Sequence, residues 1–269
     1  MTEAIDALLV ILNDPKLLTR GNQGVVAVDE GYKAEVARDL ATFMAKNGGG
    51  LNEAQDLFKH SPESVQLSNV AYFASELERL GQVKEAIAVY HFVVSKTSDP
   101  KLRLNHAIHL EEIKKNLNQV EASLADFSQA LSLWSSLAPC SDIECTEWKS
   151  RLRKYVLDWH HVEKKKPTTE LFTAYQAYIK TFPQEVDMSL WAAAGYQVLE
   201  NWVAAIKLYD QAVKLTVAGE AQKGVNNQEA LPSLEDLLLT TIELAEHSKD
   251  QTLLRQAYGQ YLKLSSQKR

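Results

Sequence analysis

Two histidine-containing segments have the residue types and spacing that could bind a metal or take part in catalysis. His106 and His109 stand three residues apart, with Glu112 three residues further on, and such spacings place side chains on one face of a helix. The sequence offers no clear fourth ligand or catalytic base for this set. We therefore predict no metal site and no catalytic residue here, and we interpret residues 158–161, which contain two further histidines, in the same way.

The only two cysteines, Cys140 and Cys145, share one polar segment with Asp142 and Glu144. Zinc modules usually take their ligands from two such pairs, so a single pair does not predict a zinc site. No histidine partner for a catalytic thiol can be identified from the sequence. A local disulfide would need an oxidising compartment. The sequence leaves open whether the two cysteines pair.

The composition excludes several functional classes. The chain has 269 residues, of which 45% are hydrophobic and 24% charged, as in an ordinary folded protein. A net charge of -6 argues against a protein that coats nucleic acid. The sequence has no basic, apolar leader, no run long enough to span a membrane and no phosphate-binding loop motif. We expect a cytoplasmic protein without cofactor, nucleic-acid partner or membrane insertion.

Proline positions and apolar spacing predict an all-α fold. The seven prolines all lie between segments of helical periodicity, where a missing amide hydrogen is tolerated. In one such segment Ala86, Val89 and Val93 recur at spacings of three and four, which forms one apolar stripe. Residues 30–46 form another helix, followed by three glycines. The only β-like run, residues 25–28, is interpreted as irregular because a lone strand has no bonding partner.

A small or apolar residue followed four positions later by an aromatic one recurs along most of the chain. Successive aromatic residues are separated by 37, 48, 34 and 49 residues, which indicates one structural unit that returns with insertions. The pairs are Ala86 and Tyr90, Ser123 and Phe127, Leu171 and Tyr175, Ala205 and Tyr209, and Leu254 and Tyr258.

This pattern resembles the tetratricopeptide repeat family. The clearest unit spans residues 67–100, with Gly81 at the turn between its two helices, and a second spans 186–219. The turn glycine is missing from the other units. The resemblance implies a right-handed α-α superhelix of about five to six helix pairs. Weaker units cover residues 104–137, 152–185 and 235–265.

The resemblance also implies a division of the chain. Residues 1–66 would form an N-terminal helical segment, either a degenerate repeat or a cap. Residues 67–269 would form the repeat array, with insertions near 138–148 and 218–232. Long connections within an array are often functional.

In the family that this chain resembles, the first helix of each pair lines a concave groove. We therefore expect a non-enzymatic scaffold, adaptor or assembly factor that binds a partner segment; the alternative is a structural subunit packed permanently into a larger complex. Chaperone-binding members carry basic residues and asparagines at positions occupied here by Ala71, Glu112 and Asp187, which argues against that specificity. The residues expected to contact a partner are Asn105, Glu112, Arg153, Lys154, His160, Lys164 and Gln197.

Residues 149–166 carry an excess of five positive charges in an otherwise acidic chain. Such a segment is either a solvated helix face or a docking site for an acidic segment of a protein or peptide partner. The partner itself and the oligomeric state cannot be deduced from the sequence.

Overall fold

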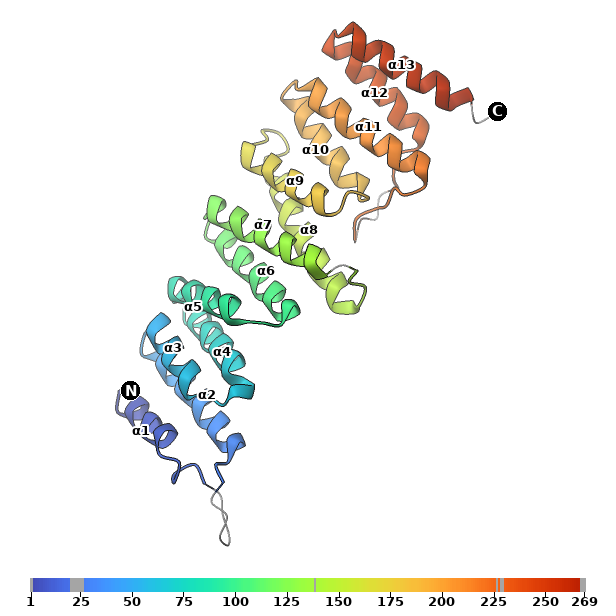
Figure 1. Cartoon of the computed structure of the whole chain (residues 1–269). Coiled ribbons are helices and arrows are strands. Elements are labelled where there is room, and N and C mark those ends of the chain that lie inside the picture. The colour runs from blue at the N-terminus through green and yellow to red at the C-terminus, as the bar shows by residue number, and fades with distance from the viewer. Residues whose placement is uncertain (1, 20–26, 138, 226, 228–229, 267–269) are drawn as a thin grey trace. The chain divides into compact units, whose positions relative to one another are not determined.

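The structure is a computed structural model that describes residues 2–19, 27–137, 139–225, 227 and 230–266 (Figure 1). Within these ranges the chain is all-α, with thirteen α-helices, one 3-10 helix and no strand. No described helix is both long and apolar enough to cross a lipid bilayer. The chain divides into two compact units, Met1–Gln119 and Val120–Arg269, called unit 1 and unit 2 below.

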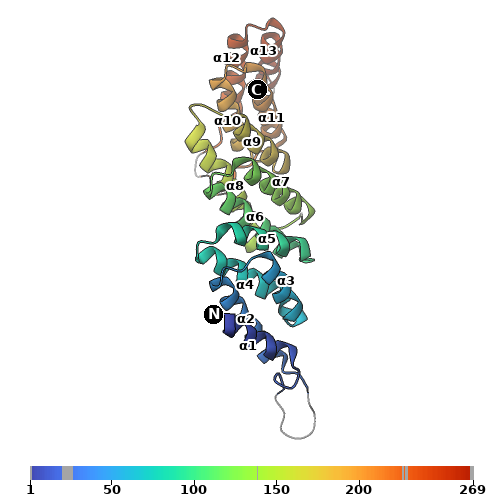
Figure 2. The same ribbon diagram turned by 90° about the vertical axis from the view of Figure 1, so that its left-hand side faces the viewer.

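Unit 1 is a stack of helices in which α2 packs against α4 and α3 packs against α5, in addition to contacts between sequence neighbours (Figure 2). Its core includes Leu40, Leu57 and Phe73, which are fully buried. Helices α2 and α3 pack directly on α4, so unit 1 includes residues on both sides of position 66. The helices are α1 (Thr2–Asn13), α2 (Glu30–Lys46), α3 (Leu51–His60), η1 (Glu63–Val65), α4 (Gln66–Arg79), α5 (Val83–Lys96) and α6 (Pro100–Asn116).

Unit 2 continues the same pattern of helices packed on their neighbours. The first helix, α7, contacts both α8 and α9, and from α9 to α13 each helix packs on the next. The helices are α7 (Val120–Leu137), α8 (Ile143–Glu163), α9 (Thr169–Thr181), α10 (Val186–Val198), α11 (Trp202–Ala218), α12 (Leu234–Ser248) and α13 (Gln251–Ser266).

Most sequence predictions about the helices are confirmed. The helix expected over residues 30–46 is α2, and the seven prolines lie between helices or, like Pro100, at the first helical position. Val25 and Val26 of the β-like run lie outside the described residues, whereas Val28 forms an isolated antiparallel bridge with Thr19.

Five short connections between helices use the same turn, and Gly219 (71°) begins the longer α11–α12 connection with the same pair of hydrogen bonds. A residue with positive φ follows the first helix and donates its backbone N–H to the carbonyl three residues earlier, as Gly81 does to Glu78. In four of the five turns the next N–H reaches back five residues, which completes the helix-ending motif that glycine favours. The positive-φ residues are Gly48 (80°), Gly81 (79°), Asn118 (56°), Glu200 (55°) and Lys249 (57°).

The aromatic residues of the repeat pattern fill the spaces between helices, as predicted, in all but the last unit. Phe127 and Tyr175 are almost fully buried and Tyr209 is half-buried between two clusters of apolar residues. Tyr258 is an exception at 45% exposure. The prediction is wrong there because α13 is the last described helix, and none of the described helices covers that face.

The two predicted insertions have different outcomes. Near residues 138–148 the additional residues mostly lengthen a helix, because α8 begins at Ile143, and a loop insertion is therefore wrong there. Between α11 and α12 the predicted long connection is present. It is joined to the helices by backbone hydrogen bonds from Gln222 to Gln184 and from Val186 to Gln222.

The shared turn predicts opposite effects of substitution at two equivalent positions. Replacing Glu200 by glycine should raise the free energy of unfolding by about 1 kcal/mol, because a side chain in the left-handed region costs roughly 1–2 kcal/mol. Gly81→Ala should lower it by a similar amount for the same reason. Urea denaturation of both variants measures the effect, with Glu200→Ala as the control that keeps the strain. A Glu200→Gly variant no more stable than Glu200→Ala would contradict this account.

Candidate functional site

Helices α4 and α6 of unit 1 are joined by a histidine held between two carboxylates. The ring of His109 places Nε2 2.9 Å from Glu78 Oε2 and Nδ1 3.8 Å from Glu112 Oε2. The three side chains remain about one-third exposed. Glu112 and Glu78 together raise the pKa of His109 above its ordinary value, against the opposing effect of burial. The group is thus a charged, partly accessible surface site.

Tyr90 of α5 lies beneath this site and links it to the core. Its ring meets the His109 ring edge-on at 4.9 Å, and its hydroxyl donates to Glu78 Oε2 at 3.4 Å. His106 also lies near Tyr90, with ring centres 6.0 Å apart, and burial lowers the pKa of His106. Burial thus disfavours the charged form of His106, whereas the two carboxylates favour the charged form of His109.

The histidine pair does not form a metal site with Glu112. The two ring nitrogens of His109 face separate carboxylates, and within the described residues His106, His109 and Glu112 do not bring three ligand atoms together. Asn105 is half-buried on the same helix, α6. Glu78 could not be identified from the sequence as the partner of His109, because the two residues lie 31 positions apart in the chain.

In unit 2, Arg153 is buried and paired with carboxylates of its own chain. Only 1% of the residue is exposed, its Nη1 donates to Glu185 Oε2 at 3.0 Å, and its Nη2 donates to Asp187 Oδ2 at 2.5 Å. Burial opposes the guanidinium charge, but Asp187 and Glu185 outweigh it and raise the pKa of Arg153. Arg153 is therefore not part of an accessible partner-binding surface, contrary to the sequence prediction.

A second basic residue of the predicted docking segment, Lys149, pairs with one of the same buried carboxylates. Lys149 Nζ lies 2.5 Å from Glu185 Oε1, and the hydroxyl of Tyr178 donates to Glu185 Oε2 at 2.7 Å. The buried carboxylate further raises the pKa of Tyr178, which burial already raises. Two of the positive charges in residues 149–166 are thus neutralised inside unit 2, which weakens the expectation of an acidic partner there.

The connection between α11 and α12 closes over the buried cluster. Gly224 donates its backbone N–H to Asp187 Oδ1 at 3.2 Å, and Asn227 donates from Nδ2 to Asp187 Oδ2 at 2.5 Å. A Cβ on Gly224 would lie closer to the guanidinium of Arg153 than any real contact allows. Glycine is therefore required at this position for the loop to reach Asp187.

Helices α8 and α10 also meet through aromatic side chains. The His160 ring stacks on Trp191 with ring centres 5.6 Å apart, and its Nδ1 lies 2.5 Å from the Tyr175 hydroxyl. Burial lowers the pKa of His160, so the neutral ring can accept that hydroxyl hydrogen. The guanidinium of Arg153 lies 5.1 Å from the Trp191 ring centre. Trp191 was not among the predicted site residues, although it lies four positions after Asp187 on α10 and so shares a helix face with it.

The remaining predicted residues lie on different parts of unit 2. Lys154 is exposed and pairs with Asp158 one turn further along α8, at 2.6 Å. Lys164 is exposed at the C-terminal end of α8. Gln197 of α10 is half-buried and hydrogen-bonds the side chain of Tyr209. The structure therefore brings His160 close to buried Arg153 through Trp191, but shows no single cluster that contains all of the predicted residues of this unit.

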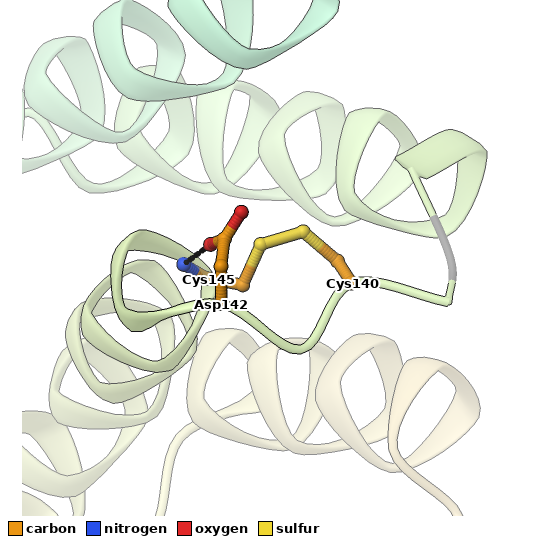
Figure 3. Close-up of side chains that lie close together, drawn as sticks. All are labelled: Cys140, Asp142 and Cys145. Atoms are coloured by element: carbon orange, nitrogen blue, oxygen red, sulfur yellow. Dashed lines mark hydrogen bonds between the residues drawn. A yellow bond between two sulfur atoms is a disulfide. The ribbon is translucent and has the colours of Figure 1, made fainter.

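Cys140 and Cys145 form a disulfide immediately before and within the first turn of α8 (Figure 3). Asp142 is the N-cap of this helix, and its Oδ1 accepts the backbone N–H of Cys145 at 2.9 Å. Cys145 is buried, whereas Asp142 is exposed. These three residues are the one group of potential metal ligands that the described part of the chain brings together.

Comparison with protein-family models and with curated protein sequences finds no match to this chain.

The steric fit of Gly224 predicts a position-specific effect on stability. Gly224→Ala should lower the free energy of unfolding of unit 2 by about 1–3 kcal/mol, because the added methyl group must displace either the loop or Arg153. Gly259→Ala is the matched control: Gly259 lies in α13 with open space around it, so alanine should be neutral or stabilising by up to about 1 kcal/mol. Equal stability of the two variants would contradict the proposed fit. Urea denaturation provides the measurement.

The pairing of His109 with carboxylates predicts that the stability of unit 1 depends on pH. Since its folded-state pKa is raised, the stabilisation is present below the unfolded pKa and is lost as the pH rises through the folded pKa. Glu78→Gln should lower the pKa of His109, measured by NMR titration of its ring protons. Glu76→Gln is the control, because Glu76 lies on the same helix but pairs with Arg79. No difference between these variants would contradict the pairing.

Proposed function

We propose that the chain is a non-enzymatic scaffold, adaptor or assembly factor that holds a protein or peptide segment along the first helices of its helix pairs. In this proposal the pairs form a right-handed superhelix like that of the tetratricopeptide repeat family. The shared turn supports the repeat, since five connections end the preceding helix in the same way.

The observation that carries the proposal is that first helices meet side by side through polar and aromatic side chains. In unit 1, Glu78 of α4 contacts His109 of α6. In unit 2, His160 of α8 stacks on Trp191 of α10. Half-buried groups of this kind combine hydrogen-bonding capacity with apolar contact area, which is how binding surfaces recognise a partner.

The charges on these faces favour different segments of a partner. In unit 1, Glu78 and Glu112 present carboxylates around His109, and in unit 2 the exposed basic side chains on and next to α8 include those of Lys154 and Lys164. An acidic partner segment would therefore contact the exposed lysines of α8, while Arg153 contributes to the stability of unit 2.

The alternative, a structural subunit of a larger complex, is favoured by one other observation. On α13, Tyr258 is 45% exposed and Leu262, one turn further on, is 66% exposed. Two large apolar side chains on one helical stripe are typical of a surface that a partner covers. In this alternative the terminal helix, and not the face of the first helices, forms the permanent contact.

Site-specific crosslinking distinguishes the two proposals. A photoreactive benzoylphenylalanine at Ala194, an exposed position on first helix α10, should capture a partner in extracts of the source organism. The same residue at Val217, an exposed position on second helix α11, is the matched control and should not. Capture at Tyr258 without capture at Ala194 would contradict groove binding and support the structural subunit.

A further inference from the structure

The start of α8 brings together two sulfur atoms and one carboxylate oxygen. The ligand atoms of Cys140, Asp142 and Cys145 all lie within 4.8 Å of one another (Figure 3). Cys140 and Asp142 belong to the connection before α8, and Cys145 lies in its first turn. The helix start holds Asp142 beside Cys145, since Asp142 caps α8 through the N–H of Cys145, and the disulfide holds Cys140 beside both.

The disulfide seen here closes one of the shortest loops that such a bond can close. It joins residues only five positions apart. The stabilisation from a crosslink grows with the length of the loop that it closes, because it acts by restricting the unfolded chain. A bond across so short a loop therefore stabilises the fold less than a bond across a long one would. The reduced form of the two sulfur atoms has a chemistry of its own.

In the reduced state these groups match the preferences of a soft divalent cation. Thiolates select zinc-like ions, and a carboxylate oxygen is an accepted further ligand. Two thiolates and one carboxylate around a divalent cation leave a net charge of about -1, which the positive end of a helix also favours.

We propose that reduced Cys140 and Cys145, together with Asp142, bind one zinc-class cation at the start of α8. The three side chains supply three of the four positions of a tetrahedral site, and water or a partner's side chain supplies the fourth. This site does not depend on the scaffold function proposed above, because it uses none of the groove residues.

The disulfide and the cation-bound form are alternative states of one site. A low-molecular-weight disulfide such as oxidised glutathione can convert the cation-bound form into the disulfide form. The two protein thiolates then lose two electrons and form the Cys140–Cys145 bond, the glutathione disulfide is split and takes up two protons to leave as two thiols, and the divalent cation is released. A reducing thiol reverses the exchange.

Cobalt(II) is the probe for the site, because thiolate ligation produces a charge-transfer absorption that histidine or carboxylate ligation lacks. Full-length protein reduced with a phosphine should develop this band and saturate at one equivalent of Co²⁺, and Zn²⁺ should displace it. The Cys140→Ser, Cys145→Ser double variant should show no band. Reduced wild-type protein without the band would overturn the proposal.

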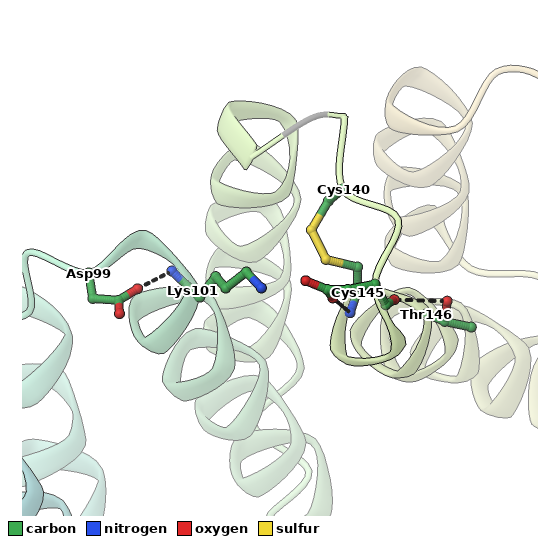
Figure 4. Close-up of a disulfide and its surroundings, with 6 residues drawn as sticks. Asp99, Lys101, Cys140, Cys145 and Thr146 are labelled. Atoms are coloured by element: carbon green, nitrogen blue, oxygen red, sulfur yellow. Dashed lines mark hydrogen bonds between the residues drawn. A yellow bond between two sulfur atoms is a disulfide. The ribbon is translucent and has the colours of Figure 1, made fainter.

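Asp142 needs a variant that separates ligation from helix capping. Asp142→Asn keeps a good N-cap residue but removes the anionic ligand, so Co²⁺ affinity should fall by at least about tenfold, the lower end of the loss seen even for outer-shell partners. Asp99→Asn is the matched control, because Asp99 caps α6 through the N–H of Lys101 at 2.8 Å (Figure 4). It should leave Co²⁺ affinity unchanged. Equal affinities of the two variants would overturn the three-ligand site.

Alkylation provides a second readout that does not depend on a spectrum. Zn²⁺ should slow the reaction of iodoacetamide with Cys140 and Cys145 in reduced protein, as followed by mass spectrometry of the two peptides. Cation binding elsewhere on the chain would leave both alkylation rates unchanged, and that result also counts against the proposal.

Discussion

The geometry of five helix connections depends on one backbone position, the residue in the left-handed region that ends the preceding helix. In four of them that residue and its neighbour return two N–H groups to the last turn, so the chain reverses within a few residues and the apolar stripes of both helices face each other. Gly48 and Gly81 adopt this conformation without a side-chain conflict. Glu200 and Lys249 adopt it despite one, which means that burial between the helices outweighs the local strain.

The helices and their pairing could be predicted from the sequence because both are encoded locally. The helix over residues 30–46 follows from an apolar stripe with an N-terminal Asp29 cap and a glycine end, and the repeat follows from small and aromatic residues at fixed spacing. The left-handed turns at Glu200 and Lys249 could not be predicted, since neither residue type favours that conformation. Helix α1 was missed because its apolar run is short, and it becomes a clear element only through packing on α2.

The candidate site was harder to predict, because charged side chains are normally placed on the surface. Arg153 was assigned to a partner-binding face, whereas in the fold it meets Asp187, 34 residues later. The separation of Arg153 from Asp187 is 34 residues, the length of one predicted repeat. That spacing could have indicated that the two side chains lie close together. Gly224 carries no such signal, because only the position of Arg153 in three dimensions explains why a larger residue would not fit.

The buried cluster around Asp187 also has a consequence for how unit 2 forms during synthesis. Helix pairs with short turns can associate as soon as they leave the ribosome, since their contacts are close in sequence. Asp187, the carboxylate partner of Arg153, can accept its hydrogen bond from Gly224 only after Gly224 has been synthesised. For that interval the nascent chain holds an arginine whose surroundings are incomplete, so the arrival of the α11–α12 connection marks the step at which this part of unit 2 becomes committed to its final packing.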